Sequence, residues 1–312
     1  MVPENPFLSP QNVVCPPALL RKAQAAPTPR VAIARAGASL PMEAARDATE
    51  AGIMAPVFTG ERAMIEAEAE KLSWDISKFE IVDAEGEEAS GKAAAFVCGE
   101  GKADVLMKGQ LHTDVFMKSA LNRDAGLRTG RRLVHIFHIS HPSGRGAITI
   151  SDAAVNVAPN IETRQDATRE TVKLLHMIGT ENPKVAFLSA TESVISSVPS
   201  SVEADELATW AKANIKGAEF SGPLALDLIL SRDAVAIKGL TDNPVAGQAD
   251  AIIVPDIVSG NTLFKSLVYL AGGCAGGIVM GAKVPILLTS RADPPAARMA
   301  SAALAALVNA AQ

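Results

Sequence analysis

Short apolar runs alternate with amphipathic helical patterns along most of this chain. Runs such as Val31–Ala34, Val105–Met107 and Ile252–Pro255 are apolar throughout rather than at every second residue. Continuous apolar strands are typical of a parallel sheet that helices cover on both faces. The alternation therefore predicts an α/β fold with a largely parallel sheet. Further strands are predicted at Val134–Ser140, Ala147–Ser151 and Pro285–Thr289, and a final helix at Pro294–Ala310.

The chain of 312 residues is long enough for two domains, at about 150 residues for each domain. The segment HPSGRG (His141–Gly146) interrupts the strand pattern with Pro and Gly, so we place a domain limit there. We expect two doubly wound α/β domains with a cleft between them, one formed by residues 1–140 with 285–312 and the other by 141–284. In such folds, ligands bind at the carboxyl ends of the strands.

Composition excludes several classes of protein. Hydrophobic residues make up 48% and charged residues 20%, which excludes a disordered chain. Aromatic residues make up only 4% and the net charge is −5, so a nucleic-acid binder is not expected. Cys15, Cys98 and Cys274 are far apart, which argues for a reducing compartment and against a zinc site. No secretory signal or membrane span is found, so we expect a soluble cytoplasmic protein with no membrane partner.

Two familiar ligand motifs are not supported by the sequence. The strand Val31–Ala34 is followed by ARAGASLPME, which lacks the G-x-G-x-x-G spacing of a dinucleotide site. The glycine cluster Ala271–Gly281 also lacks it, and we interpret it as helix termination and close helix–strand packing. His135, His138 and His141 lie on a predicted strand and point to alternate faces, so they cannot converge on a metal.

Two basic or polar segments could bind an anion. Between Glu100 and Val134 there are seven cations against four carboxylates, and the loop GLRTGRR contains Arg128. This loop is either a solvated turn or an anchor for phosphate or CoA. Near the C-terminus, PILLTSRADPP places Ser290 and Arg291 between a strand and a helix start, with Asp293 as the expected N-cap. This is either an anion site or an ordinary strand–helix junction.

Taken in order, these and neighbouring segments resemble the phosphate acetyl/butyryl transferase family (phosphotransacetylases and phosphotransbutyrylases). The segments are MKGQLHTD (Met107–Asp114), GLRTGRRLVH (Gly126–His135), SDAAVNVAP (Ser151–Pro159), SGPLALD (Ser221–Asp227), GQADAIIVPDIVSGNTLFKSL (Gly247–Leu267) and GIVMGAKVPILLTSRAD (Gly277–Asp293). LLTSRAD, preceded by GAKVP, is closer to the butyryl branch, or to the transferase domain of forms fused to a hydratase-like domain.

The resemblance implies reversible transfer of a short acyl group, acetyl or butyryl, between CoA and inorganic phosphate. The CoA thiolate attacks the acyl phosphate directly, so the small-molecule substrates are acyl-CoA, phosphate and acyl phosphate, with no covalently bound cofactor and no metal. The resemblance also implies a fold similar to that of isocitrate and isopropylmalate dehydrogenases, with the active site in the cleft between the domains. A homodimer is expected on the same ground.

The resemblance also assigns the catalytic residues. Ser290 and Arg291 match the family's serine–arginine pair, in which the serine stabilises the tetrahedral transition state. In the acetyl branch a catalytic aspartate follows seven residues after that serine, but this position is Ala297 here. Asp293 is the nearest carboxylate to replace it as the base that ionises the thiol, and Asp256 is a second candidate.

Five residues are assigned to phosphate or CoA binding: Arg128, Lys108, Thr113, Asn261 and Lys265. Two other functions remain open alternatives. The first is an NAD- and metal-dependent hydroxy-acid dehydrogenase of the same fold, which would need a carboxylate cluster for Mg²⁺. The second is a non-catalytic CoA-binding module that has lost its base, as Ala297 suggests.

Overall fold

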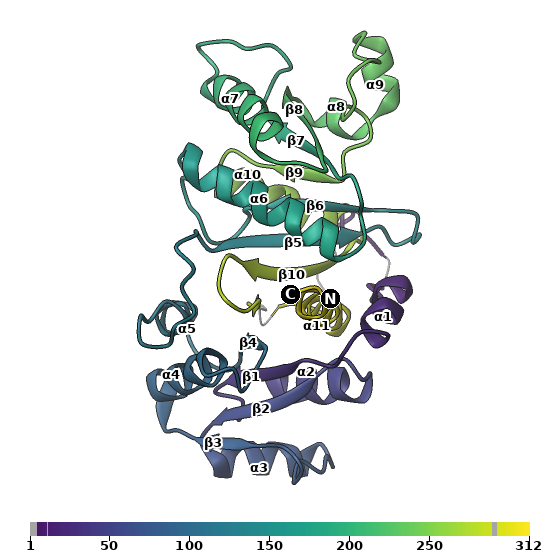
Figure 1. Cartoon of the computed structure of the whole chain (residues 1–312). Helices are drawn as coiled ribbons and strands as arrows, with labels where there is room; N and C mark the ends of the chain where they lie inside the picture. The colour runs from purple at the N-terminus through teal and green to yellow at the C-terminus, as the bar shows by residue number, and fades with distance from the viewer. Residues whose placement is uncertain (1–4, 11, 289–291) are drawn as a thin grey trace. The chain divides into compact units, whose positions relative to one another are not determined.

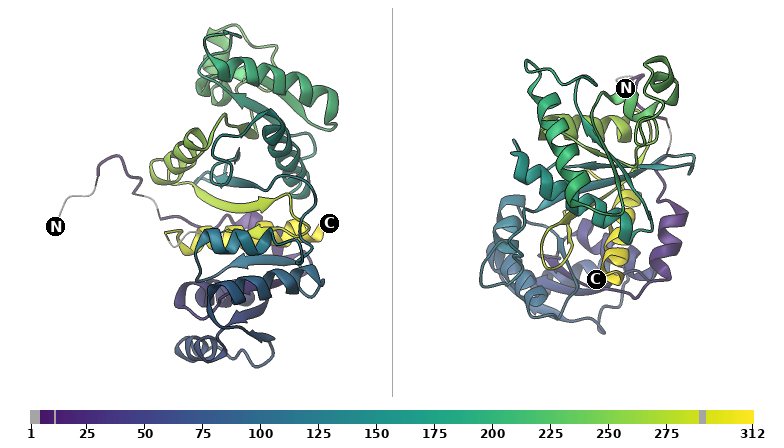
Figure 2. Two further views of the ribbon diagram at one scale, coloured as in Figure 1. Left: turned by 90° about the vertical axis from the view of Figure 1, so that its left-hand side faces the viewer. Right: turned by 45° about the horizontal axis from the view of Figure 1, so that its top comes forward.

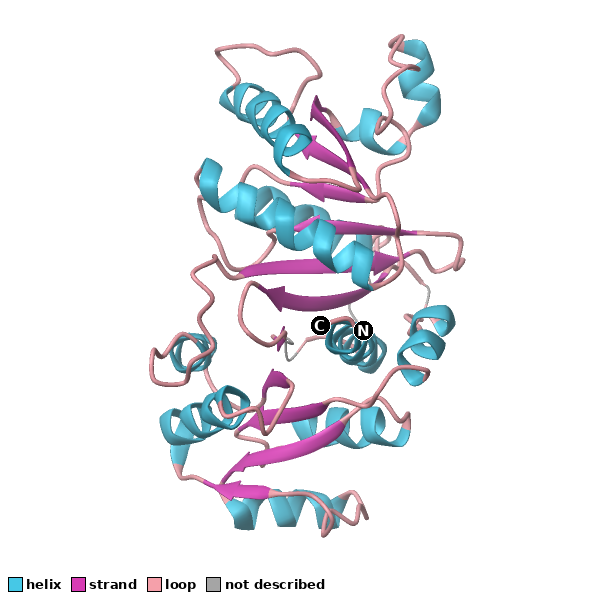
Figure 3. Ribbon diagram, in the orientation of Figure 1, coloured by secondary structure: helices cyan, strands magenta, loops and turns pink. Residues whose placement is uncertain are grey.

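The computed structural model describes residues 5–10, 12–288 and 292–312. The chain divides into two compact units. Unit I consists of Val13–Arg131 and Gly276–Gln312, and unit II consists of Met1–Asn12 and Arg132–Ala275. Helices flank the strands in each unit (Figure 3), so the predicted α/β fold class is confirmed. The predicted domain limits stay a prediction.

The strands of unit I are ordered β3-β2-β1-β4-β11-β10. Figure 1 labels these strands except β11. They are β1 (Arg30–Ala34), β2 (Ala55–Gly60), β3 (Ile81–Asp83), β4 (Val105–Lys108), β11 (Ile286–Leu287) and β10 (Cys274–Met280), whose first two residues belong to unit II. The strands from β3 to β11 run parallel, and β10 runs antiparallel to β11. Ile33, Phe58 and Leu106 are fully buried in this sheet, as the apolar runs predict.

The helices of unit I form two groups. They are α1 (Pro17–Gln24), α2 (Ser39–Glu50), α3 (Arg62–Lys71), α4 (Gly86–Gly99), α5 (Thr113–Ala120) and α11 (Pro295–Ala310). Helix α4 packs against α5, whereas α2 packs against α3 and α11. Helix α11, yellow in Figure 2, also packs against α1.

A close contact between α11 and β10 explains part of the glycine cluster. A Cβ at Gly276 would lie 2.8 Å from a Leu304 side-chain atom and 3.1 Å from the Ala300 backbone. The N–H of the next residue, Gly277, donates to Oγ of Ser301 at 2.9 Å. Helix and strand can approach this closely because Gly276 has no side chain at the contact, which agrees with the close helix–strand packing interpreted from the sequence.

Unit II contains a second set of strands in the order β5-β6-β9-β7-β8. These are β5 (Val134–Ser140), β6 (Ala147–Ser151), β7 (Lys184–Leu188), β8 (Glu219–Leu224) and β9 (Ala251–Ile253). The helices are α6 (Ile161–Met177), α7 (Pro199–Asn214), α8 (Leu226–Leu230), α9 (Arg232–Ile237) and α10 (Ile257–Tyr269). In this set β5 and β6 are antiparallel, and the described pairs β6–β9, β7–β9 and β7–β8 are parallel. The segment His141–Gly146 forms the turn of that hairpin, with the His141 N–H donating to the Gly146 carbonyl at 2.9 Å.

The start of α11 differs from the expectation. The helix begins at Pro295, its N-cap residue is Pro294, and no side chain caps it. Asp293 as the N-cap is therefore wrong. The reason is that the sequence has two consecutive prolines, and either can occupy the first helical position, which needs no N–H. In the described ranges, no helix is both long and apolar enough to cross a membrane.

Candidate functional site

The carboxyl ends of β1, β4 and β11 meet at one edge of the unit I sheet. Ala34 pairs with Lys108, and Met107 pairs with Leu287, so the three parallel strands end side by side. The Gly109 N–H donates to the Ala34 carbonyl at 2.9 Å, which ties the chain leaving β4 to the end of β1. Ligands of parallel α/β sheets bind at this edge.

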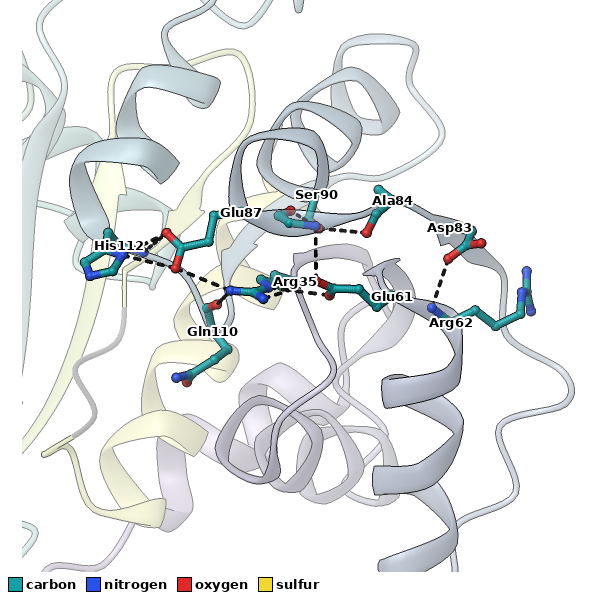
Figure 4. A network of polar contacts seen from close by, with 10 residues as sticks. Arg35, Glu61, Arg62, Asp83, Ala84, Glu87, Ser90, Gln110 and His112 are labelled. Carbon is teal, nitrogen blue, oxygen red and sulfur yellow. Dashed lines mark hydrogen bonds and ion pairs between the residues drawn. The ribbon is translucent and has the colours of Figure 1, made fainter.

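Arg35, the residue directly after β1, organises the polar groups at this edge (Figure 4). Its backbone has a positive φ of 53°, which is uncommon for a side-chain-bearing residue. Its guanidinium lies 3.1 Å from Oε1 of Glu61 and 3.3 Å from Oε1 of Glu87. It also donates to the Gln110 carbonyl at 3.4 Å. One cation thus joins the residues that follow β1, β2 and β4 to the first turn of α4.

Glu87 in turn holds His112. The backbone N–H of His112 donates to Oε2 of Glu87 at 3.0 Å, and its ring Nδ1 lies 2.8 Å from the same oxygen. Figure 4 shows the imidazole beside this carboxylate, with Arg35 on the other side of Glu87. His112 is the N-cap residue of α5. The arrangement is a chain of contacts from Arg35 through Glu87 to His112.

The carboxyl groups of Glu61 and Glu87 both have lowered pKa values. Burial raises the pKa of Glu61, but the Arg35 guanidinium and the backbone N–H groups around it lower that pKa below its ordinary value. The backbone N–H and the imidazole of His112 lower the pKa of Glu87. Hydrogen bonds to the charged form and a neighbouring cation both favour the carboxylate. Glu61 and Glu87 are therefore acceptors at neutral pH.

Three predicted binding residues also lie in unit I. Lys108 ends β4, and Thr113 begins α5, so they stand on either side of the loop that contains His112. Arg128 is exposed and forms a backbone bridge with Ala282. Its neighbour Thr129 donates through Oγ1 to the Gly281 carbonyl at 2.5 Å. The GLRTGRR loop is therefore fastened to the chain segment that leads into β11.

The predicted catalytic pair, Ser290 and Arg291, lies outside the described residues, directly after the described end of the β11 segment. Asp293 precedes α11, and its backbone carbonyl accepts from the Arg298 guanidinium at 2.6 Å. Ala297, in the first turn of α11, is buried.

In unit II, the predicted polar residues form a loop–helix junction. Asp152 follows β6, and its Oδ1 accepts from the Ala154 N–H at 2.9 Å. Asp256 is the N-cap of α10, with Oδ1 accepting from the Ser259 N–H at 2.9 Å. Asn261 donates to the Ala153 carbonyl at 3.2 Å. These side chains hold the loop after β6 against α10, which also presents Lys265 at its exposed surface.

The three histidines of HIFHISH have three separate environments. His135 is buried and stacks on Phe137, with ring centroids 4.3 Å apart. Burial lowers the pKa of His135 to about 4. His138 Nδ1 lies 3.0 Å from Oγ1 of Thr149, and His141 Nδ1 lies 2.7 Å from Oγ of Ser143. Within the part of the chain that is described, no three His, Cys, Asp or Glu side chains are grouped to hold a metal ion.

Comparison with known proteins gives the family. Residues 87–306 match the family model of the phosphate acetyl/butaryl transferases. A phosphate acetyltransferase from Rhizobium meliloti is 38% identical over 262 residues, which are 84% of this chain and 83% of that protein. A phosphate butyryltransferase from Clostridium acetobutylicum is 37% identical over 291 residues, which are 93% of this chain and 96% of that protein. The chain belongs to this family of acyltransferases.

Solved structures agree with this assignment. A branched-chain phosphotransacylase from Enterococcus faecalis has a TM-score of 0.80 at 28% identity, covering 90% of this chain and 99% of that one. A 4-hydroxythreonine-4-phosphate dehydrogenase from Burkholderia phymatum has a TM-score of 0.57 at 12% identity, covering 90% of this chain and 98% of that one. The second likeness is one of fold alone. This member of the phosphate acetyl/butaryl transferase family therefore resembles that dehydrogenase in fold.

The sequence did not reveal the Arg35 network. His112 lies within the motif MKGQLHTD, but its partner Glu87 is 25 residues earlier in the chain, so no local spacing connects them. Arg35 did carry a signal, because it directly follows the predicted apolar strand Val31–Ala34. In α/β folds, ligands bind at the carboxyl ends of the strands, so a charged residue at that position is a candidate for ligand binding.

Proposed function

We propose that this protein catalyses reversible transfer of an acetyl or butyryl group between CoA and inorganic phosphate. The observation that carries the proposal is the near-complete match to both an acetyl and a butyryl transferase, with 37–38% identity. The carboxyl edge of unit I supports it, since Lys108 and Thr113 bring a cation and a hydroxyl to the ends of parallel strands.

In this proposal the thiolate of CoA attacks the carbonyl carbon of the acyl phosphate directly. Ser290 donates a hydrogen bond to the oxygen on which charge develops, and Arg291 and Arg128 bind the phosphoryl oxygens. Lys108 and Thr113 contribute donors at the carboxyl edge of the unit I sheet, and we assign phosphate or CoA binding to Asn261 and Lys265 of unit II. CoA and phosphate are substrates, and no covalently bound cofactor takes part.

The test is phosphate-dependent release of free thiol from acetyl-, propionyl- and butyryl-CoA. We expect Ser290→Ala and Arg291→Ala to reduce turnover about 100-fold or more, the effect of removing one oxyanion donor. Arg128→Ala should raise the KM for phosphate, whereas Arg145→Ala, which removes an exposed arginine in the β5–β6 turn, should not. The profile over the three chain lengths assigns the acyl specificity. No release from any of them would refute the proposal.

We also propose that the enzyme is a cytoplasmic homodimer that associates through α10. Only Gly260 of this helix is buried, although the helix is rich in apolar residues. Val258 is 70% exposed and Tyr269 50%, and Leu270, directly after the helix, is 53% exposed. Apolar groups gathered on one exposed helix are typical of an interface, and the occupant we propose is a second copy of this chain. Sedimentation equilibrium should show that Val258→Glu dissociates the dimer, whereas Ile237→Glu, on α9, does not.

A further inference from the structure

His112 and Glu87 form a carboxylate–imidazole pair that the proposed function has not yet used. Glu87 holds the residue at two points, the backbone N–H at 3.0 Å and the ring Nδ1 at 2.8 Å. Arg35 holds Glu87 from the other side at 3.3 Å. Two-point attachment fixes both the position of the residue and the orientation of the ring.

The pair also fixes which ring nitrogen is basic. Glu87 is ionised at neutral pH, because His112 lowers its pKa, and an ionised carboxylate can only accept hydrogen bonds. Nδ1 therefore carries the proton that it donates to Glu87, and the lone pair is on Nε2. The His112 side chain is 71% exposed. Among the described residues, the hydrogen bonds of its ring are all to Glu87 and pass through Nδ1, and its backbone N–H also donates to Glu87.

The location of His112 suits a base for the proposed reaction. It lies between Lys108, at the end of β4, and Thr113, at the start of α5, both of which we assign to substrate binding. The strand β11 pairs in parallel with β4, so Leu287 at the end of β11 lies at the same edge. At Ala297, where the acetyl branch has its aspartate, the structure places a buried methyl group.

We propose that Nε2 of His112 is the general base that deprotonates the CoA thiol, with Glu87 as its positioning residue. This inference rests on the proposed acyl transfer. The thiol gives its proton to Nε2, and the sulfur forms a bond to the acyl carbon. The bond from that carbon to the phosphate oxygen then breaks, with its electron pair on the oxygen. The imidazolium returns the proton to the phosphate, so thiol and acyl phosphate become thioester and hydrogen phosphate.

The decisive variant is His112→Asn. The asparagine amide can still donate to Glu87, and the backbone N–H is unchanged, but the basic nitrogen is gone. We expect kcat for thioester formation from CoA and acetyl phosphate to fall about 100- to 10,000-fold, the usual contribution of a general base, with KM for acetyl phosphate little changed. Because the site is exposed, added imidazole should restore activity in proportion to its concentration. Glu87→Gln should give a smaller loss.

His141→Asn is the matched control, since it removes an exposed histidine from the β5–β6 turn of unit II and should leave kcat unchanged. Two results would overturn the inference: His112→Asn retaining kcat within about threefold of wild type, or a folded His112→Asn that is inactive and gains nothing from imidazole, which would indicate a structural role. A wild-type enzyme with no phosphate-dependent thiol release would instead refute the acyl transfer itself, and the inference would fall with it.

Discussion

Gly109 and Ala34 are joined so closely that only glycine fits at the first of these positions. The Gly109 N–H donates to the Ala34 carbonyl at 2.9 Å, and a Cβ at Gly109 would overlap that same oxygen and the carbonyl of Arg35. This contact holds the ends of β1 and β4 together and so sets the spacing between Arg35 and the loop that contains His112.

Gly109→Ala should therefore destabilise unit I and disturb the site at once. Backbone atoms cannot move aside as a flexible side chain can, so we expect a cost of about 1–3 kcal/mol, as for overpacked cores. Urea denaturation measures that cost. Gly146→Ala is the control, because nothing lies within 4 Å of a Cβ at that position. Equal stability of the two variants would contradict the prediction.

The Arg35–Glu61 pair should make stability depend on pH on the acidic side. The pKa of Glu61 in the folded protein lies below its ordinary value of 4.5. A lowered folded pKa contributes stability above the unfolded pKa, and that contribution is lost as the pH falls through the folded pKa. The free energy of unfolding should thus fall below pH 4.5 more steeply in wild type than in Glu61→Gln. Glu66→Gln, which changes an exposed glutamate on α3, should keep the wild-type slope.

Asp256 can be tested for its two suggested roles with two variants. As the N-cap of α10 it should tolerate Asn, which accepts the same hydrogen bond, whereas Asp256→Ala should cost about 0.5–2 kcal/mol of stability. If His112 is the base, Asp256→Asn should also keep its turnover. Thermal unfolding and thiol release, measured on both variants, check the two roles separately. A stable but inactive Asp256→Asn would favour Asp256 as the base.

Ser301 should be one of the more sensitive serines in the chain. Its Oγ accepts from the buried Gly277 N–H at 2.9 Å and donates to the Ala297 carbonyl at 2.9 Å. Ser301→Ala leaves a buried N–H without its partner, so we expect a loss of about 1–3 kcal/mol. Ser143→Ala, in the exposed β5–β6 turn, should cost far less. Differential scanning calorimetry of the two variants compares them, and equal melting temperatures would count against this account.

Elements with a strong local signal were predicted well from the sequence. The strands Val134–Ser140 and Ala147–Ser151 have the predicted limits, because apolar residues end sharply at the Pro- and Gly-rich turn between them. The start of α11 was displaced by one residue because two prolines are adjacent. Local composition therefore indicates where strands and helices form. It fixes the end of an element only where a single residue can occupy the terminal position.

The candidate site was predicted only in part, because its contacts join distant segments. Lys108 and Thr113 were assigned through a resemblance carried by one continuous motif, and their roles stay a prediction. Arg35 and Glu61 come from the connections after β1 and β2, and Glu87 from the first turn of α4. The parallel arrangement of the strands brings these side chains together. Contacts of this kind depend on the order of the strands in the sheet. The spacing of residues within one segment carries no information about that order.

Unit I is discontinuous, since β11 and α11 are made after all of Arg132–Ala275. During synthesis on the ribosome, the segment from β5 to β9 can collapse as soon as it emerges, whereas β4 must wait for its neighbour β11. Until then the apolar surface that α11 will cover, including α1 and α2, stays open to other chains. During translation, the segment synthesised first should therefore need chaperones most. In most proteins the N-terminal region folds first, whereas here it must wait for the C-terminal segment.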